Sequence, residues 1–345
     1  MLRKIMLTVV VVFVVVALAG AFWVYRAVYA PNVTAPPEGE KYHQVYIRTG
    51  WGYEQVLQML TEKNIIINKT GFDKIARQMN YPQKVYPGRY LVEGGMSNRA
   101  LALLLRSGKQ TPYDIAIHNI RTKPDLVQLI CSKLETDSIE LSRMLNDTAY
   151  LAQHNLTPQN VIGMFIADTY RFNWNTDAET FFKRMKREYD NFWTDERIQK
   201  ARLNGLTPFE AITLASIVEE ETAQNDEMNQ IAGVYYNRLS ANMPLQADPT
   251  VKFAVGDFSL KRILTEHLAI ESPYNTYKYT GLPPGPIRIP SLTALQAVLN
   301  PTEHSYLYFC AKEDFSGYHN FAVTYEEHLI NARKYRDELN RRNIK

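Results

Sequence analysis

Three consecutive glutamates, Glu219, Glu220 and Glu221, end an apolar run in the segment LTPFEAITLASIVEEETA at residues 206–223. The segment opens with T-P-F-E at 207–210, a capping box with proline at the first helical position, so we predict a helix here. A carboxyl group held against apolar side chains has its charged form disfavoured and its pKa raised. Such a group suits the role of general acid near neutral pH.

Helical geometry separates the three carboxylates. With Ala211 set at zero and about 100° per residue, three more positions fall within ~40° of it, so the four predict a buried stripe: Ala211, Ala215, Val218 and Thr222. Glu219 at ~80° and Glu221 at ~280° flank this stripe, whereas Glu220 at ~180° is predicted to be a surface residue. The spacing therefore leaves Glu219 and Glu221 as candidate acids. The alternative is a solvated acidic helix end, in which only the aliphatic parts of the glutamate side chains are partly buried.

Two further stretches carry groups that could bind a sugar. In MPLQADPTV, residues 243–251, Gln246, Asp248 and Thr250 alternate around a turn marked by Pro249. Such a turn presents hydrogen-bonding groups to a ligand, or it caps its own backbone.

The second stretch, SPYNTYKYTGLPPGPIRI at residues 272–289, contains four prolines and two glycines. We predict a rigid, irregular loop. Its tyrosines and amides, among them Asn275 and Tyr277, could stack on sugar rings and bond to hydroxyl and acetamido groups. The alternative is a purely structural Ω-loop.

Several other chemistries lack support in the sequence. The seven histidines are scattered without an H-E-x-x-H motif, so we predict neither a metal site nor a cofactor. G-x-S-x-G and P-loop patterns are missing as well. The Lys/Arg residues form no block, which argues against nucleic-acid binding. Cys131 and Cys310 could pair outside the cytoplasm or remain two separate buried thiols.

The N-terminus predicts where the protein is located. Residues 5–25 form an uncharged apolar run of membrane-spanning length. Because Arg3 and Lys4 precede the run, we predict a cytoplasmic tail at 1–4, a transmembrane anchor at 5–26 and an exported body. The proline-bearing segment 27–41 is predicted to be a linker. The alternative is a signal peptide cleaved after Ala17-Leu18-Ala19.

Residues 42–112 predict a small module with the order strand, helix, helix, strand, followed by one more helix capped by Ser97. This order is found in LysM modules, which bind the glycan of peptidoglycan. The alternative is a spacer domain without a ligand. The expected elements are His43–Ile47, Trp51–Glu62, Thr70–Met79, Val85–Val92 and Ser97–Gly108.

Residues 113–345 predict a mainly helical domain with a small β-sheet, so the whole chain is expected to have an α+β fold. The predicted strands and turns are Tyr113–Ile117, Asn160–Trp174, Tyr306–Ala311 (buried) and His319–Phe321. The predicted helices besides 206–223 are Lys123–Leu134, Ser138–Leu145, Asp147–His154, Asp177–Trp193, Asp195–Asn204, Asp226–Leu239, Ser291–Leu299 and Tyr325–Leu339.

Six motifs in a fixed order resemble the YceG-like family of endolytic murein transglycosylases. They are ASIVEEETA (215–223), VYYNRL (234–239), LQADPTV (245–251), SPYNTY (272–277), TGLPPGPI (280–287) and YLYF (306–309). A weaker tail matches at Gly317, His319, Phe321, Thr324 and Glu327-His328. One departure lies upstream, where family members often carry E-G-x-L-F-P-D-T-Y. Here residues 162–170 read IGMFIADTY, so the glutamate and the proline of that motif are missing.

The resemblance implies a periplasmic enzyme of the cell inner membrane that cleaves the β-1,4 bond between N-acetylmuramic acid and N-acetylglucosamine without water. It assigns the acid/base role to Glu219, the first glutamate after Ser-Ile-Val. Gln246, Asp248, Asn275 and Tyr277 are predicted to position the sugar. The implied partners are peptidoglycan glycan strands and peptidoglycan synthases. The alternatives are a non-catalytic, membrane-anchored peptidoglycan-binding scaffold and a hydrolytic muramidase.

Overall fold

The structure is a computed structural model, and it describes residues 2–260 and 262–342. The chain divides into two compact units. Unit 1 contains the chain up to Asp114 together with the short segments Lys133–Glu135 and Arg171–Asp177. Unit 2 contains Ile115–Ser132, Thr136–Tyr170 and the remainder of the chain from Ala178 onward.

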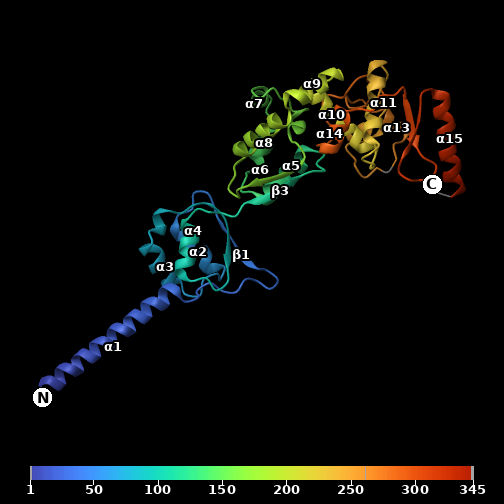
Figure 1. Ribbon diagram of the computed structural model, residues 1–345. Coiled ribbons are helices and arrows are strands. Elements are labelled where there is room, and N and C mark those ends of the chain that lie inside the picture. Colours follow the sequence, from blue (N-terminus) through green and yellow to red (C-terminus); the bar gives the residue numbers. More distant parts are fainter. Residues whose placement is uncertain (1, 261, 343–345) are drawn as a thin grey trace. The chain divides into compact units, whose positions relative to one another are not determined.

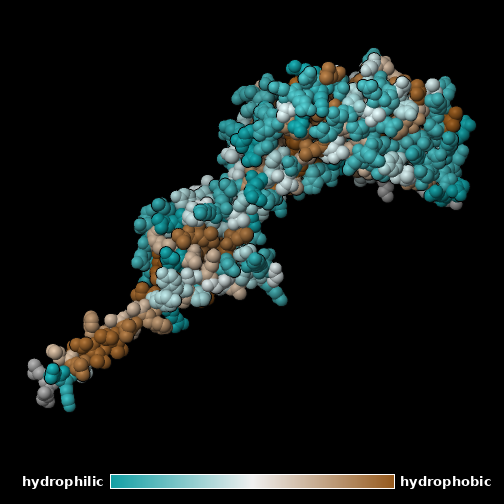
Figure 2. Space-filling model, viewed as in Figure 1, coloured by the Kyte–Doolittle hydropathy of each residue, from teal (hydrophilic) through white to brown (hydrophobic). Residues whose placement is uncertain are grey.

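Unit 1 begins with a long apolar helix, α1, which spans Leu2–Tyr29 (Figure 1). Figure 2 shows hydrophobic residues along this helix. Within its stretch Arg3–Tyr29, an 18-residue window has a mean hydropathy of 3.0, and none of that window is buried against the rest of the chain. By length and composition it could cross a membrane or serve as a signal sequence.

The rest of unit 1 has the predicted strand–helix–helix–strand order. Its strands β1 (Tyr42–Ile47) and β2 (Gly88–Glu93) pair antiparallel, with Tyr42 opposite Glu93. The other elements are α2 (Tyr53–Glu62), α3 (Lys69–Gln78), η1 (Tyr81–Gln83) and α4 (Asn98–Arg106). The core contains fully buried side chains from all of these elements, among them Ile47, Leu60, Phe72, Tyr81, Tyr90 and Leu101. A LysM-like role for this unit remains a prediction.

The first part of the predicted linker is packed against unit 1. Asn32 and Val33 are only 5% and 3% exposed. Asn32 donates to Asn98 Oδ1 at 2.5 Å, and Asn98 donates to the backbone oxygen of Ala27 at 2.8 Å. A buried amide needs hydrogen-bond partners, and these side chains supply them for one another. The network thereby attaches the end of α1 to α4.

Unit 2 is mainly helical. Within the described residues, the chain has three two-stranded sheets, of which β1–β2 is the first; the others are β3–β4 and β5–β6. Strands β5 (Tyr308–Ala311) and β6 (His319–Ala322) belong to unit 2, whereas β3 (Tyr113–Ile117) and β4 (Asp168–Phe172) each have residues in both units. The helices are α5 (Lys123–Lys133), α6 (Ser138–Met144), α7 (Thr148–Ala152), η2 (Val161–Met164), α8 (Ala178–Phe192), α9 (Asp195–Leu203), α10 (Pro208–Glu221), α11 (Met228–Ser240), α12 (Asp248–Val255), α13 (Thr265–Leu268), α14 (Leu292–Leu299) and α15 (Tyr325–Arg341).

Three local predictions were wrong. The turn predicted around Pro249 is the first turn of helix α12, because proline fits the first helical positions. The strand predicted to be buried, β5, is half-buried, since it pairs only with β6. Finally, α10 has no single buried stripe. Its residues 211–218 are all at most 3% exposed, because other segments of unit 2 surround this helix.

The two cysteines do not form a disulfide. Cys131 and Cys310 are both free and partly buried, and burial raises the pKa of each thiol. Of the two alternatives left open by the sequence, separate thiols are the one observed.

Candidate active site

The three glutamates lie at the C-terminal end of α10. The predicted capping box starts this helix: Thr207 Oγ1 accepts from the backbone N–H of Glu210, whose carboxylate accepts from the backbone N–H of Thr207 at 2.7 Å. A helix C-terminus carries partial negative charge. Since the last turn of α10 contains no basic residue, the glutamates need partners from other segments.

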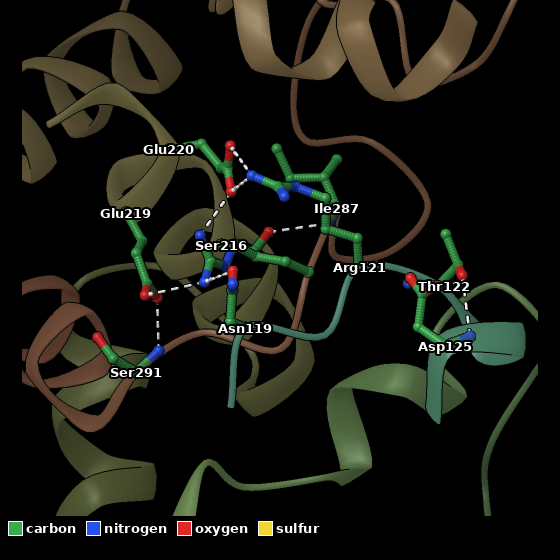
Figure 3. A network of polar contacts seen from close by, with 10 residues as sticks. Asn119, Arg121, Thr122, Asp125, Ser216, Glu219, Glu220, Ile287 and Ser291 are labelled. Atoms are coloured by element: carbon green, nitrogen blue, oxygen red, sulfur yellow. Dashed lines mark hydrogen bonds and ion pairs between the residues drawn. The ribbon is translucent and has the colours of Figure 1, made fainter. Parts of the chain in front are cut away.

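Glu220 forms ion pairs with two arginines (Figure 3). Arg121 Nη2 lies 2.7 Å and Arg288 Nη1 lies 2.5 Å from Glu220 Oε1. The Glu220 side chain is only 15% exposed, so the prediction of a surface residue was wrong. The helical wheel of α10 could not indicate that the segment before α5 and the loop before α14 cover this face.

Glu219 holds the loop that leads into α14. Its Oε2 accepts the backbone N–H of Ser291 at 2.5 Å, and its Oε1 lies 3.4 Å from Arg288 Nη2. One helical turn earlier, Ser216 Oγ accepts the backbone N–H of Ile287 at 3.0 Å (Figure 3). Both carboxylate oxygens of Glu219 thus face donors from this loop. These contacts attach the loop to α10.

Glu221 has different surroundings. Its Oε1 accepts the hydroxyl proton of Tyr235 at 2.7 Å, and Tyr235, on α11, is 1% exposed. Burial raises the pKa of Glu221 to about 7, and the negative charges of Asp248 and Glu220 contribute in the same direction. The Tyr235 hydrogen bond and the positive charge of Arg238 lower this pKa, but burial is the largest effect. A carboxyl group with this pKa can both donate and accept a proton near neutral pH.

Three of the four predicted sugar-positioning residues, Gln246, Asp248 and Tyr277, are connected to the surroundings of Glu221. Tyr277 donates to Asp248 Oδ1 at 2.6 Å. Gln246 Oε1 accepts from Arg238 Nη1 at 3.3 Å. Asp248 and Arg238 are two of the three residues named above whose charges act on Glu221. Gln246 is also held in the left-handed region, with φ of 51°, which costs a non-glycine residue energy and is frequent at functional sites.

Asn275 is not placed to contact a ligand in this conformation. Its side chain is fully buried. The amide nitrogen donates to the backbone oxygens of Leu268 and Ile270, and Oδ1 accepts the backbone N–H of Tyr277. Asn275 therefore shapes the irregular loop that carries Tyr277.

Sequence reasoning assigned no role to Tyr235, Arg238, Arg121 or Arg288. Tyr235 and Arg238 stood inside the motif VYYNRL, but helical spacing within α11 does not show which other helix a side chain meets. Arg121 and Arg288 are isolated basic residues in loops. An acidic helix end without basic residues of its own was the one signal that cationic partners must come from elsewhere.

A raised carboxyl pKa beside tyrosines and amide groups is a feature of sites that cleave glycosidic bonds. The model of the YceG-like family matches residues 45–334 of this chain. The chain therefore belongs to the YceG-like family.

Three relatives have the following similarity to the chain. The endolytic murein transglycosylase of Bacillus subtilis (strain 168) is 34% identical over 245 residues, which cover 70% of this chain and 67% of the relative. The protein of the same name from Streptococcus pneumoniae serotype 2 (strain D39 / NCTC 7466) is 26% identical, with 94% of this chain and 64% of the relative covered. The matches with these two curated relatives thus span about two thirds of the length of each. The crystal structure of a putative yceG-like protein from Listeria monocytogenes has a TM-score of 0.56 and 26% identity, covering 85% of this chain and 99% of that one.

Proposed function

We propose that this chain is an endolytic murein transglycosylase and that Glu221 is its general acid and base. The observation that carries this proposal is the environment of Glu221: a carboxyl group whose pKa burial raises to about 7, with Tyr235 as its hydrogen-bond donor. The family and the names of the curated relatives support the activity.

The resemblance assigned the acid/base role to Glu219, and that assignment remains a prediction. The contacts favour Glu221 for two reasons. Glu219 already accepts the backbone N–H of Ser291 and faces Arg288, so its oxygens hold the protein together. Among the described residues, Glu221 has a single hydrogen-bond donor, Tyr235, which leaves its second oxygen for a substrate.

The reaction needs only one carboxyl group. Protonated Glu221 gives its proton to the oxygen that links N-acetylmuramic acid to N-acetylglucosamine, and the bond from that oxygen to muramic C1 breaks. The resulting carboxylate then takes the proton of the muramic C6 hydroxyl, whose oxygen bonds to C1 and closes a 1,6-anhydro ring. Water takes no part, and the attack within one sugar has a large proximity advantage. Glu221 is protonated again at the end of the cycle.

The remaining proposals concern substrate binding and location. Gln246, Asp248 and Tyr277 position the sugar next to Glu221, and Asn275 supports them by fixing the loop. The LysM-like unit 1 binds the glycan strand. Helix α1 anchors the chain in the inner membrane with the catalytic body in the periplasm, close to the peptidoglycan synthases that supply nascent strands. The length and hydropathy of α1 support the anchor.

Incubation of the full chain with uncrosslinked glycan strands tests the proposed activity. We expect shorter strands with 1,6-anhydro-N-acetylmuramic acid at their new ends. Hydrolysis by a muramidase would give reducing ends that are heavier by one water, ~18 Da, because water then replaces the C6 hydroxyl as nucleophile. A binding scaffold would give no product. Either of these outcomes would contradict the proposal.

The pKa of Glu221 predicts the pH dependence of the reaction. Because the acid must be protonated when substrate binds, kcat/KM is expected to fall as the pH rises through about 7. The Tyr235 hydrogen bond lowers this pKa. Tyr235→Phe removes that bond, so the alkaline limb of the pH–rate profile should move to higher pH.

The matched control for this profile is Tyr236→Phe. Tyr236 is the neighbouring tyrosine on α11, and its hydroxyl donates to the backbone oxygen of Val298 instead of a glutamate. We expect this variant to keep the wild-type limb. An unchanged limb in Tyr235→Phe, or an equal shift in both variants, would rule out Glu221 as the titrating acid.

A further inference from the structure

A buried carboxylate holds a histidine close to the end of α10. Glu227 is 5% exposed, and its Oε1 accepts the backbone N–H of His319 at 2.8 Å. Its Oε2 lies 2.7 Å from His319 Nδ1. The same Oε2 accepts the hydroxyl proton of Thr222 at 3.3 Å. Since Thr222 directly follows Glu221, this carboxylate connects His319 to the end of the helix that carries the acid.

An aromatic side chain makes a second connection between His319 and the proposed site. The ring of Phe309 on β5 packs edge-to-face against His319, with centroids 5.3 Å apart. It also packs edge-to-face against Tyr235, with centroids 6.0 Å apart. Tyr235 is the residue that donates to Glu221. His319 is therefore connected to Glu221 by two separate sets of contacts. One runs through Glu227 and Thr222, and the other runs through Phe309 and Tyr235.

The contacts of His319 fix which ring nitrogen is available. A carboxylate only accepts hydrogen bonds, so Nδ1 carries the proton that faces Glu227, and in the neutral ring Nε2 presents a lone pair. No described residue forms a hydrogen bond with Nε2, and this atom is not among the buried polar atoms without a partner. The side chain is 13% exposed. Nε2 is therefore not sealed from solvent, and it has no hydrogen-bond partner among the described residues.

We propose that His319 is a substrate-binding residue whose Nε2 accepts a hydrogen bond from a hydroxyl group of the bound glycan. The proposal rests on the proposed function of the Glu221 site and adds a residue to it. Glu227 acts as the positioning residue, because it sets the tautomer and the orientation of the ring. Hydroxyl groups are the donors that a glycan offers in largest number, and a lone-pair acceptor on a fixed ring selects one of them.

Two substitutions separate binding from a structural role. In His319→Asn, the side-chain amide can take the place of Nδ1 and keep the contact with Glu227, but nothing reaches the position of Nε2. In His319→Gln, the longer side chain places its amide group near the position of Nε2. We expect His319→Asn to raise the KM for uncrosslinked glycan strands by about 3- to 10-fold, the effect of one neutral hydrogen bond, with kcat nearly unchanged. His319→Gln should recover part of that loss.

The wild-type chain serves as the reference in the same assay, with thermal melting of all three proteins. An unchanged KM in His319→Asn would overturn the proposal, and so would a loss of similar size in both variants, which would indicate a structural role. If the wild-type chain gave no product, the proposed function itself would fail. Normal wild-type cleavage with an unaffected His319→Asn variant would contradict only the assignment of His319.

Discussion

Glu221→Gln is expected to lower kcat/KM for glycan cleavage by about 1,000-fold, within the range that general acid–base catalysis contributes. Glutamine has nearly the same shape and can still accept the hydrogen bond of Tyr235, so the fold should persist. The amide cannot donate a proton to the glycosidic oxygen or take one from the C6 hydroxyl. Both halves of the proposed reaction are therefore lost in one substitution.

Glu219→Gln is the matched control, because it makes the same change two residues earlier on the same helix. Glutamine keeps an oxygen that can accept the backbone N–H of Ser291, so we expect cleavage to fall by less than about 10-fold, well below the loss of a general acid. Rates of strand cleavage by both variants decide between the two carboxylates. Abolished cleavage in Glu219→Gln with retained cleavage in Glu221→Gln would support the assignment from the resemblance and reject ours.

Arg288→Ala should destabilise unit 2 by about 3 kcal/mol, the usual cost of removing one partner from a buried ion pair. Arg288 is 11% exposed and faces Glu219 and Glu220, which are 16% and 15% exposed. Its removal leaves charge near the C-terminal end of a helix, where negative charge is already unfavourable. It also releases the loop that Asn119 and these glutamates hold. The free energy of unfolding, measured with urea in detergent, gives the effect.

Lys183→Ala is the control for this stability measurement. Lys183 pairs with Glu179 on α8 in the same unit, but both side chains are about 60% exposed. A solvent-exposed pair contributes little, so we expect a change within ~0.5 kcal/mol. If Arg288→Ala were no less stable than Lys183→Ala, the arginine network would not hold the loop against α10.

Much of the fold could be predicted from local patterns. The capping box that begins α10 and the alternation in β1 and β3 depend on neighbouring residues, and α10, α15, β1 and β3 begin within one or two residues of their predicted starts. The error at α12 has the same origin: Pro249 fits a turn and a helix start equally well.

The site was harder to predict, because its properties arise between segments that are far apart in the sequence. A helical wheel placed Glu220 in water, whereas Arg121 lies 99 residues earlier and Arg288 lies 68 residues later in the chain. The helical wheel placed Glu219 and Glu221 in equivalent positions, one on each edge of the predicted buried stripe. Ser291 and Tyr235, each from another segment, give the two carboxylates different environments. The resemblance brought the right motifs together but did not show these contacts.

Cleavage in water enriched in ¹⁸O tests the central claim most directly. Uncrosslinked glycan strands are incubated with the wild-type chain in this solvent, and the masses of the new ends are measured. If one carboxyl group directs the substrate's own C6 hydroxyl to C1, the new ends should be ~18 Da lighter than reducing ends and should contain no ¹⁸O, because no solvent oxygen enters the product. New reducing ends that carry ¹⁸O would show that water is the nucleophile and would contradict the proposed transglycosylase mechanism.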